Sequence, residues 1–412
     1  MEAENEPSMV DPINIRWVRV LTLAAIGWYL LLIVLHYFNQ RPLWNDEACV
    51  FTSIKYFTPA QMFSKPLDSV QQFPRMYLFL IQQVASRFDF SLLSLRFFPF
   101  ICMAGAFMAW VYLSRDFLSK ERTRLMFVLC WAASIPLIYY AAELKQYSMD
   151  VFAAGLFSVF ISCQRRICAK NRKMHMLLLV LLPWLAAFSY MVFLMLVFPF
   201  FNICRMEGWR KNGFWVYVGS CLLVIIFVYW FDVRVGNGKV LRTYWQEYFI
   251  SFDSVAAFFQ TWGDGVNNLI ARWFAEKPKW IRMAARFFMA FGLWQMFAGF
   301  WWSFKKDGYL FCSVATVALI VFVELVILGA FKIYAFTVPR TSLFFCPMLF
   351  LLAIQGMENL KQRCKWVLGP IQVVFGAYLL FVSIGIAREI FRGDLGAQSV
   401  IWESVKANAL YY

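Results

Sequence analysis

Residues Val20–Phe38 read VLTLAAIGWYLLLIVLHYF and carry no Asp, Glu, Lys or Arg. An α-helix needs about 20 apolar residues to cross the hydrocarbon core of a bilayer. The run follows Arg16 and Arg19, is too long for the apolar core of a signal peptide, and has no small-residue cleavage site. We therefore expect it to be an uncleaved transmembrane anchor with its N-terminal end in the cytoplasm.

The composition of the whole chain agrees with this first span. Of its 412 residues, 62% are apolar and only 15% are charged, whereas a soluble domain is about half apolar and a quarter charged. The net charge of +15 comes from short basic clusters between apolar runs, which orient membrane proteins, so we expect no nucleic-acid partner. We predict an all-α polytopic membrane protein in which residues 1–412 form one transmembrane domain.

Cysteine and histidine give no sign of a disulfide framework or a metal centre. Most of the ten cysteines lie inside apolar runs, where they fill small spaces, and none has a zinc-like spacing. The two histidines, His36 and His175, are interpreted as interfacial residues at helix ends.

The apolar runs predict about eleven membrane spans. Residues 175–204 are too long for one span and are interrupted by Ser189 and Tyr190, so we expect a hairpin of two short helices there. The other nine predicted spans are 18–38, 93–114, 125–142, 147–163, 213–231, 281–303, 309–331, 341–356 and 366–387.

The positive-inside rule tests this scheme. With the N-terminus inside, every short basic cluster falls on the cytoplasmic side; the clusters are 115–124 (RDFLSKERTR), 165–173 (RRICAKNRK), 205–211 (RMEGWRK), 305–306 and 361–365 (KQRCK). Two longer segments, 39–92 and 232–280, then lie outside. We expect the second to be a folded loop.

The first outer segment contains an amphipathic stretch at 74–88. Its length as a helix is only about 22 Å, which is short of the bilayer core. We expect an interfacial helix whose apolar side faces the bilayer and whose polar side carries Arg75, Gln82, Gln83 and Arg87. The apolar side is formed by Tyr77, Ile81, Val84 and Phe88.

Polar residues just beyond the spans are the first candidates for chemistry, because ionisable groups near a membrane are costly. The sequence Trp44-Asn45-Asp46-Glu47 follows the first span on its outer side. Two adjacent carboxylates do not share a helix face, so one can face a cavity while the other makes a structural bond or helps to hold a cation. The alternative is a helix cap, with Asn45 or Asp46 starting a helix from Ala48 to Tyr56.

A second candidate lies in the outer turn between the third and fourth spans. It places Glu143, Lys145, Tyr147 and Asp150 at the same membrane surface as Asp46. Lysine and tyrosine together can hold a phosphate oxygen by charge and by hydroxyl. The alternative is interfacial anchoring by a snorkelling lysine and a tyrosine of the aromatic belt.

The third candidate precedes the tenth span, again outside. Arg340 can donate two hydrogen bonds to a phosphate. Glu324 lies inside the ninth span, about two turns before Lys332, and is the most deeply placed acid of the chain. It is either a functional residue or the partner in an ion pair with a neighbouring helix. Together the three stretches place carboxylates, lysine and arginine on one membrane face, where an anionic lipid headgroup lies.

This pattern resembles the GT-C glycosyltransferases that use polyprenyl-phosphate sugars, such as protein O-mannosyltransferases and the aminoarabinose transferases of lipid A. The resemblance is best over residues 15–205. It is carried by WNDEA at 44–48, Phe73-Pro74-Arg75-Met76-Tyr77 followed by Ser94-Leu-Arg96, E-x-K-Q-Y-S at 143–148 and R-T-S-L-F-F-C-P at 340–347. The family usually has a His or a second Pro where this chain has Phe73.

The resemblance implies an inverting transfer from a polyprenyl-phosphate sugar at the extracytoplasmic face of the cell (inner) membrane. Asp46 would be the general base, and Glu47 would tune it through its like charge. Lys145, Tyr147 and Arg340 would bind the donor phosphate. Supporting or acceptor-binding roles fall to Trp44, Glu143, Arg75, Arg96, Asp150 and Glu324.

The sequence does not identify the sugar, or whether the acceptor is a lipid, a glycan or a protein. Some relatives use a divalent cation and others do not, so a divalent cation is the one possible cofactor.

Two other functions are consistent with the sequence. A transporter or flippase of lipid-linked sugars is favoured by Glu324 but usually shows an internal repeat, which we do not find. A non-catalytic scaffold would tolerate neutralisation of Asp46, Lys145 and Arg340.

Overall fold

The computed structural model describes residues 12–206, 212–236, 243, 245–271, 279–305, 313–338, 340–363, 365–393 and 395. These residues form helices and connecting turns, with no β-strand among them. Parts of three predicted basic clusters (207–211, 306 and 364) and the first part of the ninth predicted span (309–312) lie outside the described part of the chain. The predicted all-helical class is confirmed.

The first half of the chain contains the long helices that carry the site. In chain order they are α1 (Pro12–Phe38), α2 (Asn45–Tyr56), α3 (Pro59–Ser64), α4 (Arg75–Ala85), α5 (Leu92–Phe117), α6 (Glu121–Ala132), α7 (Ile135–Tyr139), α8 (Tyr147–Lys170), α9 (Arg172–Leu181) and α10 (Val197–Met206). Short 3-10 turns join them: η1 (Asp68–Val70), η2 (Ser86–Phe88), η3 (Tyr140–Ala142), η4 (Leu182–Ala187) and η5 (Tyr190–Met195).

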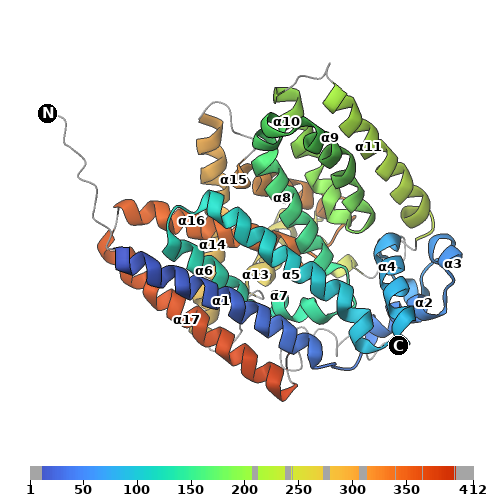
Figure 1. Ribbon diagram of the computed structural model, residues 1–412, viewed down its shortest axis with the longest axis horizontal. Coiled ribbons are helices and arrows are strands. Elements are labelled where there is room, and N and C mark those ends of the chain that lie inside the picture. The colour runs from blue at the N-terminus through green and yellow to red at the C-terminus, as the bar shows by residue number, and fades with distance from the viewer. Residues whose placement is uncertain are drawn as a thin grey trace.

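The second half continues the bundle. Its helices are α11 (Asn212–Val228), the π-helical turn η6 (Tyr229–Val233), η7 (Gln246–Tyr248), α13 (Val255–Ala271), α14 (Lys279–Lys305), α15 (Val314–Ala330), η9 (Leu343–Phe345), α16 (Cys346–Arg363) and α17 (Lys365–Arg392). In Figure 1, α17, the last described helix, lies beside α1, the first one.

Within the described ranges, six helical segments are long and apolar enough to cross a membrane. They are Arg16–Phe38, Leu92–Phe117, Tyr147–Lys170, Asn212–Val233, Leu343–Leu360 and Gln372–Arg392. Two shorter apolar helices are Tyr190–Arg205 and Val314–Ala330. The chain is therefore a helical protein of the multi-pass membrane type, and the larger count of eleven spans stays a prediction.

The predicted span 125–142 is broken in the structure, where the helices Glu121–Ala132 and Ile135–Ala142 meet at a bend of 67°. Proline lacks the N–H that bonds to the carbonyl four residues earlier, and its ring collides with that carbonyl. Pro136 has this relation to Ala132, where α6 ends. The bend directs the following turn, residues 143–146, toward the site.

The predicted break in 175–204 is confirmed. Residues 172–187 are helical in α9 and η4, and Ser189 then has extended backbone angles of φ −151° and ψ 115° before η5 begins at Tyr190. The Ser189 hydroxyl donates a 2.6 Å hydrogen bond to Oδ1 of Asp150 on α8. The break therefore also supplies a polar partner for a buried carboxylate.

Close packing of α5 against α8 fixes the centre of the bundle (Figure 1). A Cβ atom on Gly155 would lie 3.0 Å from Nε1 of Trp110, and one on Gly105 would lie 2.8 Å from the ring of Phe152. The Trp110 ring is fully buried, and its Nε1 donates to the carbonyl of Val151 at 3.3 Å. Glycine at both positions lets the two helices approach, and these helices carry Arg96 and Tyr147 at their first turns.

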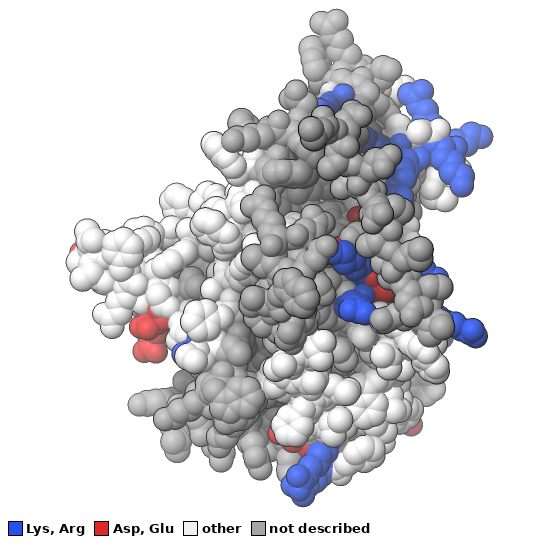
Figure 2. Space-filling view, turned by 90° about the vertical axis from the view of Figure 1, so that its left-hand side faces the viewer, with Lys and Arg blue, Asp and Glu red and all other residues white. Residues whose placement is uncertain are grey.

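Basic side chains lie at the end of the bundle where α1 begins. Arg19 pairs with Glu121 at 3.1 Å, and Arg166 near the end of α8 pairs with Asp116 near the end of α5 at 2.6 Å. Figure 2 views the molecule from this side, and Lys and Arg side chains gather there more densely than Asp and Glu. The predicted clusters 115–124 and 165–173 thus share one end of the molecule.

The first outer segment folds as α2, α3 and α4, at the opposite ends of α1 and α5 (Figure 1). The predicted helix at 74–88 is present as α4 and η2, and Tyr77 and Ile81 of its predicted apolar side are buried within the protein, but the two sides are not divided as predicted. Arg75 and Gln82 are buried, whereas Phe88 is 62% exposed. The Gln82 amide donates to the carbonyls of Ile54 and Phe57 at 2.8 and 2.6 Å, so α4 packs its polar groups against α2.

Candidate functional site

Three side chains from distant parts of the chain meet at the site. Oδ2 of Asp46, in the first turn of α2, lies 3.5 Å from Nζ of Lys145 and 3.3 Å from Nη1 of Arg340. Lys145 belongs to the turn before α8, and Arg340 to the turn before η9. The structure therefore brings together one predicted base and two of the three predicted phosphate ligands.

Each of the two cations has further partners. Nζ of Lys145 donates to Oε1 of Gln71 at 3.2 Å and lies 4.8 Å from the centre of the Phe73 ring. The Lys145 carbonyl accepts a 2.6 Å hydrogen bond from the Tyr77 hydroxyl, which holds the turn in place. Burial lowers the pKa of Lys145, while the charge of Asp46 partly restores it.

Arg340 is placed against the second outer segment. Its guanidinium carbon lies 5.2 Å from the centre of the Trp245 ring, and nearby the Thr337 hydroxyl donates to the Tyr248 carbonyl at 2.7 Å. The segment that includes η7 therefore touches the site, as expected of an outer loop. Trp245 was not among the predicted site residues, since only a tertiary contact identifies it.

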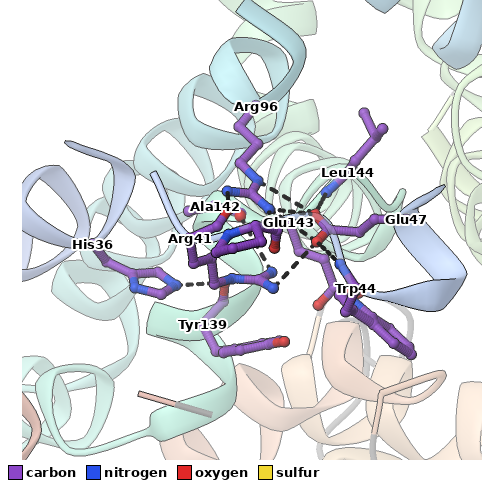
Figure 3. Close-up of polar contacts among 10 residues, drawn as sticks. His36, Arg41, Trp44, Glu47, Arg96, Tyr139, Ala142, Glu143 and Leu144 are labelled. Carbon is purple, nitrogen blue, oxygen red and sulfur yellow. Dashed lines mark hydrogen bonds and ion pairs between the residues drawn. The ribbon is translucent and has the colours of Figure 1, made fainter. Parts of the chain in front are cut away.

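Glu47 lies in a separate buried cluster with Arg96 and Arg41 (Figure 3). Its carboxylate lies 2.9 Å from Nη2 of Arg96 and 3.2 Å from Nη1 of Arg41, and it accepts a 2.7 Å bond from the Leu144 amide. Both Glu47 and Arg96 are buried. The arginines neutralise the charge of Glu47, so the geometry assigns it a structural position rather than the predicted tuning of Asp46.

The helix cap was predicted one residue too late. The helix α2 begins at Asn45, and Trp44 is its N-cap residue, with φ −84° and ψ 169°. Oε2 of Glu47 accepts from the Trp44 amide at 3.4 Å, which is the reciprocal bond of a capping box. Asp46 thus lies inside the first turn, where a carboxylate also interacts favourably with the helix dipole.

Glu143 connects the two clusters. It is fully buried, and its Oε1 accepts a 3.2 Å hydrogen bond from Nε1 of Trp44. Burial, helped by the charge of Glu47, raises the pKa of Glu143 to about 8, against the opposing effect of Arg41 and Lys145. At neutral pH Glu143 is therefore mostly protonated and can donate a hydrogen bond.

Arg41 is a site-forming residue that the sequence reasoning missed. Beyond its ion pair with Glu47, its guanidinium carbon lies 4.5 Å from the centre of the Tyr139 ring. The Tyr139 carbonyl in turn is 3.2 Å from Nε2 of His36 (Figure 3). The available signal was position, because Arg41 follows the first span and precedes the acidic pair by five residues.

Of the remaining predicted residues, Arg75 and Asp150 make structural contacts, whereas Tyr147 interacts electrostatically with Arg340 and Asp46. The Arg75 guanidinium donates to the carbonyls of Met62 and Lys65, both at 3.0 Å, so it ties α4 to α3. Asp150 is buried against Ser189. Tyr147 is buried with its ring edge-on to Tyr140 at 4.9 Å.

Asp232 is a second residue that the sequence reasoning missed. It lies in the π-helical turn η6, a local geometry that often accompanies functional positions. Its carboxylate accepts from the Arg75 amide at 3.3 Å and from the Tyr190 hydroxyl at 3.1 Å. It caps α4 from a distant part of the chain and so helps to position the outer segment.

The charges at Asp46 favour an anionic ligand over a divalent cation. Lys145 and Arg340 place two positive charges within 3.5 Å of the one carboxylate oxygen, and a bound cation would be repelled by both. Among the residues that the structure describes, no group of three or more His, Cys, Asp and Glu side chains is arranged to hold a metal ion.

No family model, no curated protein and no solved structure matches the chain.

Proposed function

We propose that this protein is an inverting glycosyltransferase that moves a sugar from a polyprenyl-phosphate donor to an acceptor at the outer face of a membrane. The observation that carries the proposal is the meeting of Asp46, Lys145 and Arg340 at one point. A carboxylate beside two cations at a membrane surface matches a reaction that removes a proton from a nucleophile and releases a phosphate.

The position of the site along the bundle supports this assignment. Arg96 lies at the site, while Arg115 lies near the other end of the same helix α5, with the basic residues of that end. Nineteen residues of helix are about 29 Å long, close to the hydrocarbon thickness of about 30 Å. The positive-inside rule then places Asp46 on the side away from the cytoplasm.

We extend the proposal to the topology. The chain has a GT-C-like bundle of about eleven spans in the cell (inner) membrane, with the N-terminus in the cytoplasm and α2, α3 and α4 as interfacial elements of the first outer segment. The six strong spans, the bent pair and the two shorter apolar helices correspond to nine of these spans, and we assign the other two to α9 with η4 and to α14.

The reaction needs one proton transfer and one displacement. Asp46 takes the proton of the acceptor hydroxyl or amine, whose lone pair attacks the anomeric carbon from the side opposite the phosphate. The bond from this carbon to the phosphate oxygen breaks, and polyprenyl phosphate leaves with the bonding electrons. Lys145 and Arg340 stabilise the charge that develops on the phosphate, and the Tyr147 hydroxyl is the proposed third ligand.

Several supporting roles follow from the contacts. Trp44 and Glu143 lie beside Asp46 and form the proposed acceptor side of the site. Arg96 positions α2 through Glu47, Arg75 positions α4, and Asp150 holds the turn at Ser189. The proposed partners are the lipid-linked sugar donor, a lipid, glycan or protein acceptor, and the membrane lipids.

The test is reconstitution of the full chain in proteoliposomes with a radiolabelled polyprenyl-phosphate sugar and an extract of envelope acceptors. We expect label to move to an acceptor with inversion at the anomeric carbon, and Arg340→Met to reduce the rate by about 100-fold or more, as for other groups that stabilise a developing oxyanion. Retention of configuration, or no transfer with a full range of lipid-linked sugars, would reject the proposal.

Translocation of lipid-linked sugars is the second candidate, and Glu324 favours it. Glu324 lies in the apolar helix α15, and its Oε2 is buried without a hydrogen-bond partner among the described residues. Ionisable groups at such depth often belong to transport pathways. Net movement of lipid-linked sugar across the liposome without glycosyl transfer, abolished by Glu324→Gln, would support this candidate over the enzyme.

A further inference from the structure

Asp46 is the most exposed member of the charged group at the site. Its side chain is 26% exposed, compared with 4% for Lys145 and 15% for Arg340. Both cations contact the same oxygen, Oδ2. The carboxylate therefore has the freedom to turn away from the cations without opening the buried structure beneath it.

The two cations, by contrast, are held without Asp46. Lys145 keeps its hydrogen bond to Gln71 and its contact with the Phe73 ring, and Arg340 keeps its contact with the Trp245 ring. Glu47 cannot replace Asp46 between them, because its carboxylate is bound by Arg96, Arg41 and the Leu144 amide. Asp46 is thus the exchangeable partner of a fixed pair of cations.

These contacts create a competition that rests on the proposed function. A phosphate that binds Lys145 and Arg340 needs the donors that Asp46 now occupies, and two anions at one position repel each other. We infer that the Asp46 carboxylate occupies the place of the donor phosphate in the ligand-free protein, and that the phosphate displaces it toward the acceptor.

This exchange imposes an order on the reaction. While Asp46 is paired with Lys145 and Arg340, its Oδ2 is engaged by both cations and is not available to an acceptor. Binding of the phosphate releases the carboxylate, so the donor binds first and the base is available only when a sugar is in place. Deprotonation of the acceptor before a donor is bound is thereby suppressed.

The same competition assists release of the product. The donor is a phosphodiester with one negative charge, whereas the product is a phosphate monoester whose second pKa is about 6 and whose charge at neutral pH approaches −2. The product therefore binds the two cations more strongly than the substrate does. Return of Asp46, after it has given its proton to solvent, offsets this stronger binding.

The test is the affinity of the purified full chain for a polyprenyl monophosphate, with farnesyl phosphate as the probe, measured by calorimetry in detergent. The wild type is compared with Asp46→Asn, which removes the competing charge and keeps the shape. We expect Asp46→Asn to bind about five times more tightly, the size of effect typical of one partly exposed ion pair. Inorganic phosphate in a second titration should show the same direction at far higher concentrations, which separates the lipid from free phosphate as the natural ligand.

Asp89→Asn is the matched control, because it removes the same charge from an exposed residue between α4 and α5 with φ 50°, a conformation that asparagine tolerates. It should leave the affinity unchanged. Weaker or equal binding by Asp46→Asn overturns the inference. Weaker binding would mean that Asp46 assists the ligand, and equal binding would mean that it does not compete with it. Asp46→Ser replaces Asp46→Asn in this test if the first variant does not fold. If Asp46→Asn binds more tightly but the wild-type protein transfers no sugar, the inference is upheld and the proposed transferase is rejected.

Discussion

Oδ2 of Asp46 lies 3.3 Å from Nη1 of Arg340, although 294 positions separate the two residues in the sequence. The contact joins the first turn of α2 to the turn before η9, and Lys145 completes it from the turn before α8. Three loops at one end of the bundle therefore form a single charged site. This site, rather than any one motif, is the basis of the functional proposal.

The buried ion pair between Glu47 and Arg96 supports the loop that carries Asp46. Removal of one partner of a buried ion pair costs about 3–5 kcal/mol, and because Arg41 still pairs with Glu47 when Arg96 is absent, the low end of this range, about 3 kcal/mol, applies here. We expect Arg96→Met to lower the free energy of unfolding by about this amount, measured by chemical denaturation in detergent. Arg87→Met, on an exposed arginine of the same outer segment, should change it by less than about 0.5 kcal/mol; equal effects would show that the pair is not what stabilises the loop.

The contact between α5 and α8 depends on Gly155. A leucine there would collide with the buried Trp110 ring, whose nitrogen lies 3.0 Å from the position of a Cβ atom. Overpacking of this kind destabilises by about 1–3 kcal/mol, so Gly155→Leu should lower the thermal midpoint and the activity together. At Gly219, where a Cβ atom meets nothing within 4 Å, the same substitution should have little effect. A tolerant Gly155 would contradict the packing described above.

Glu143 predicts a pH dependence of stability. Burial raises its pKa in the folded protein from 4.5 to about 8. Between pH 4.5 and about 8, Glu143 is protonated in the folded protein but ionised in the unfolded protein. Its contribution to stability is therefore complete below about pH 4.5 and is lost as the pH rises to about 8. Glu143→Gln keeps a neutral donor and should flatten the fall of stability over this window. An unchanged slope in the variant would mean that Glu143 is ionised at neutral pH.

The orientation of the site is open to direct measurement in intact cells. Lys55 is exposed on α2 at the site end, and Lys120 is exposed between α5 and α6 at the basic end. In a background without reactive native cysteines, a membrane-impermeant thiol reagent should label Lys55→Cys from outside and should reach Lys120→Cys only after the membrane is broken. The reverse pattern would place Asp46 in the cytoplasm and remove the lipid-linked donor from the proposal.

The convergence of Asp46, Lys145 and Arg340 could be predicted because alternation of the spans fixes which loops share a membrane side. Each residue lies just beyond an apolar run, so topology alone brought them to one end. The partner of Glu47 could not be predicted in this way. Adjacent carboxylates on a helix point in different directions, and only the position of Arg96 and Arg41 decides which of the two is buried.

Other differences have local causes that a hydropathy pattern does not contain. The bend at Ala132 follows from Pro136, whose effect was outweighed by the continuous apolar character of 125–142. Gln82 of α4 is buried because α2 offers carbonyl oxygens to its amide. Asp232 and Trp245 lie in the second outer segment, and only the fold brings them to α4 and Arg340.

The most direct measurement of the central claim is the rate of sugar transfer by Asp46→Asn, with Asp89→Asn as the charge-matched control and with folding checked by thermal unfolding. Loss of a general base typically lowers the rate by about 100- to 10,000-fold. We predict a loss of this size for Asp46→Asn, together with wild-type transfer by Asp89→Asn. A folded Asp46→Asn protein that transfers sugar at the wild-type rate would contradict the account.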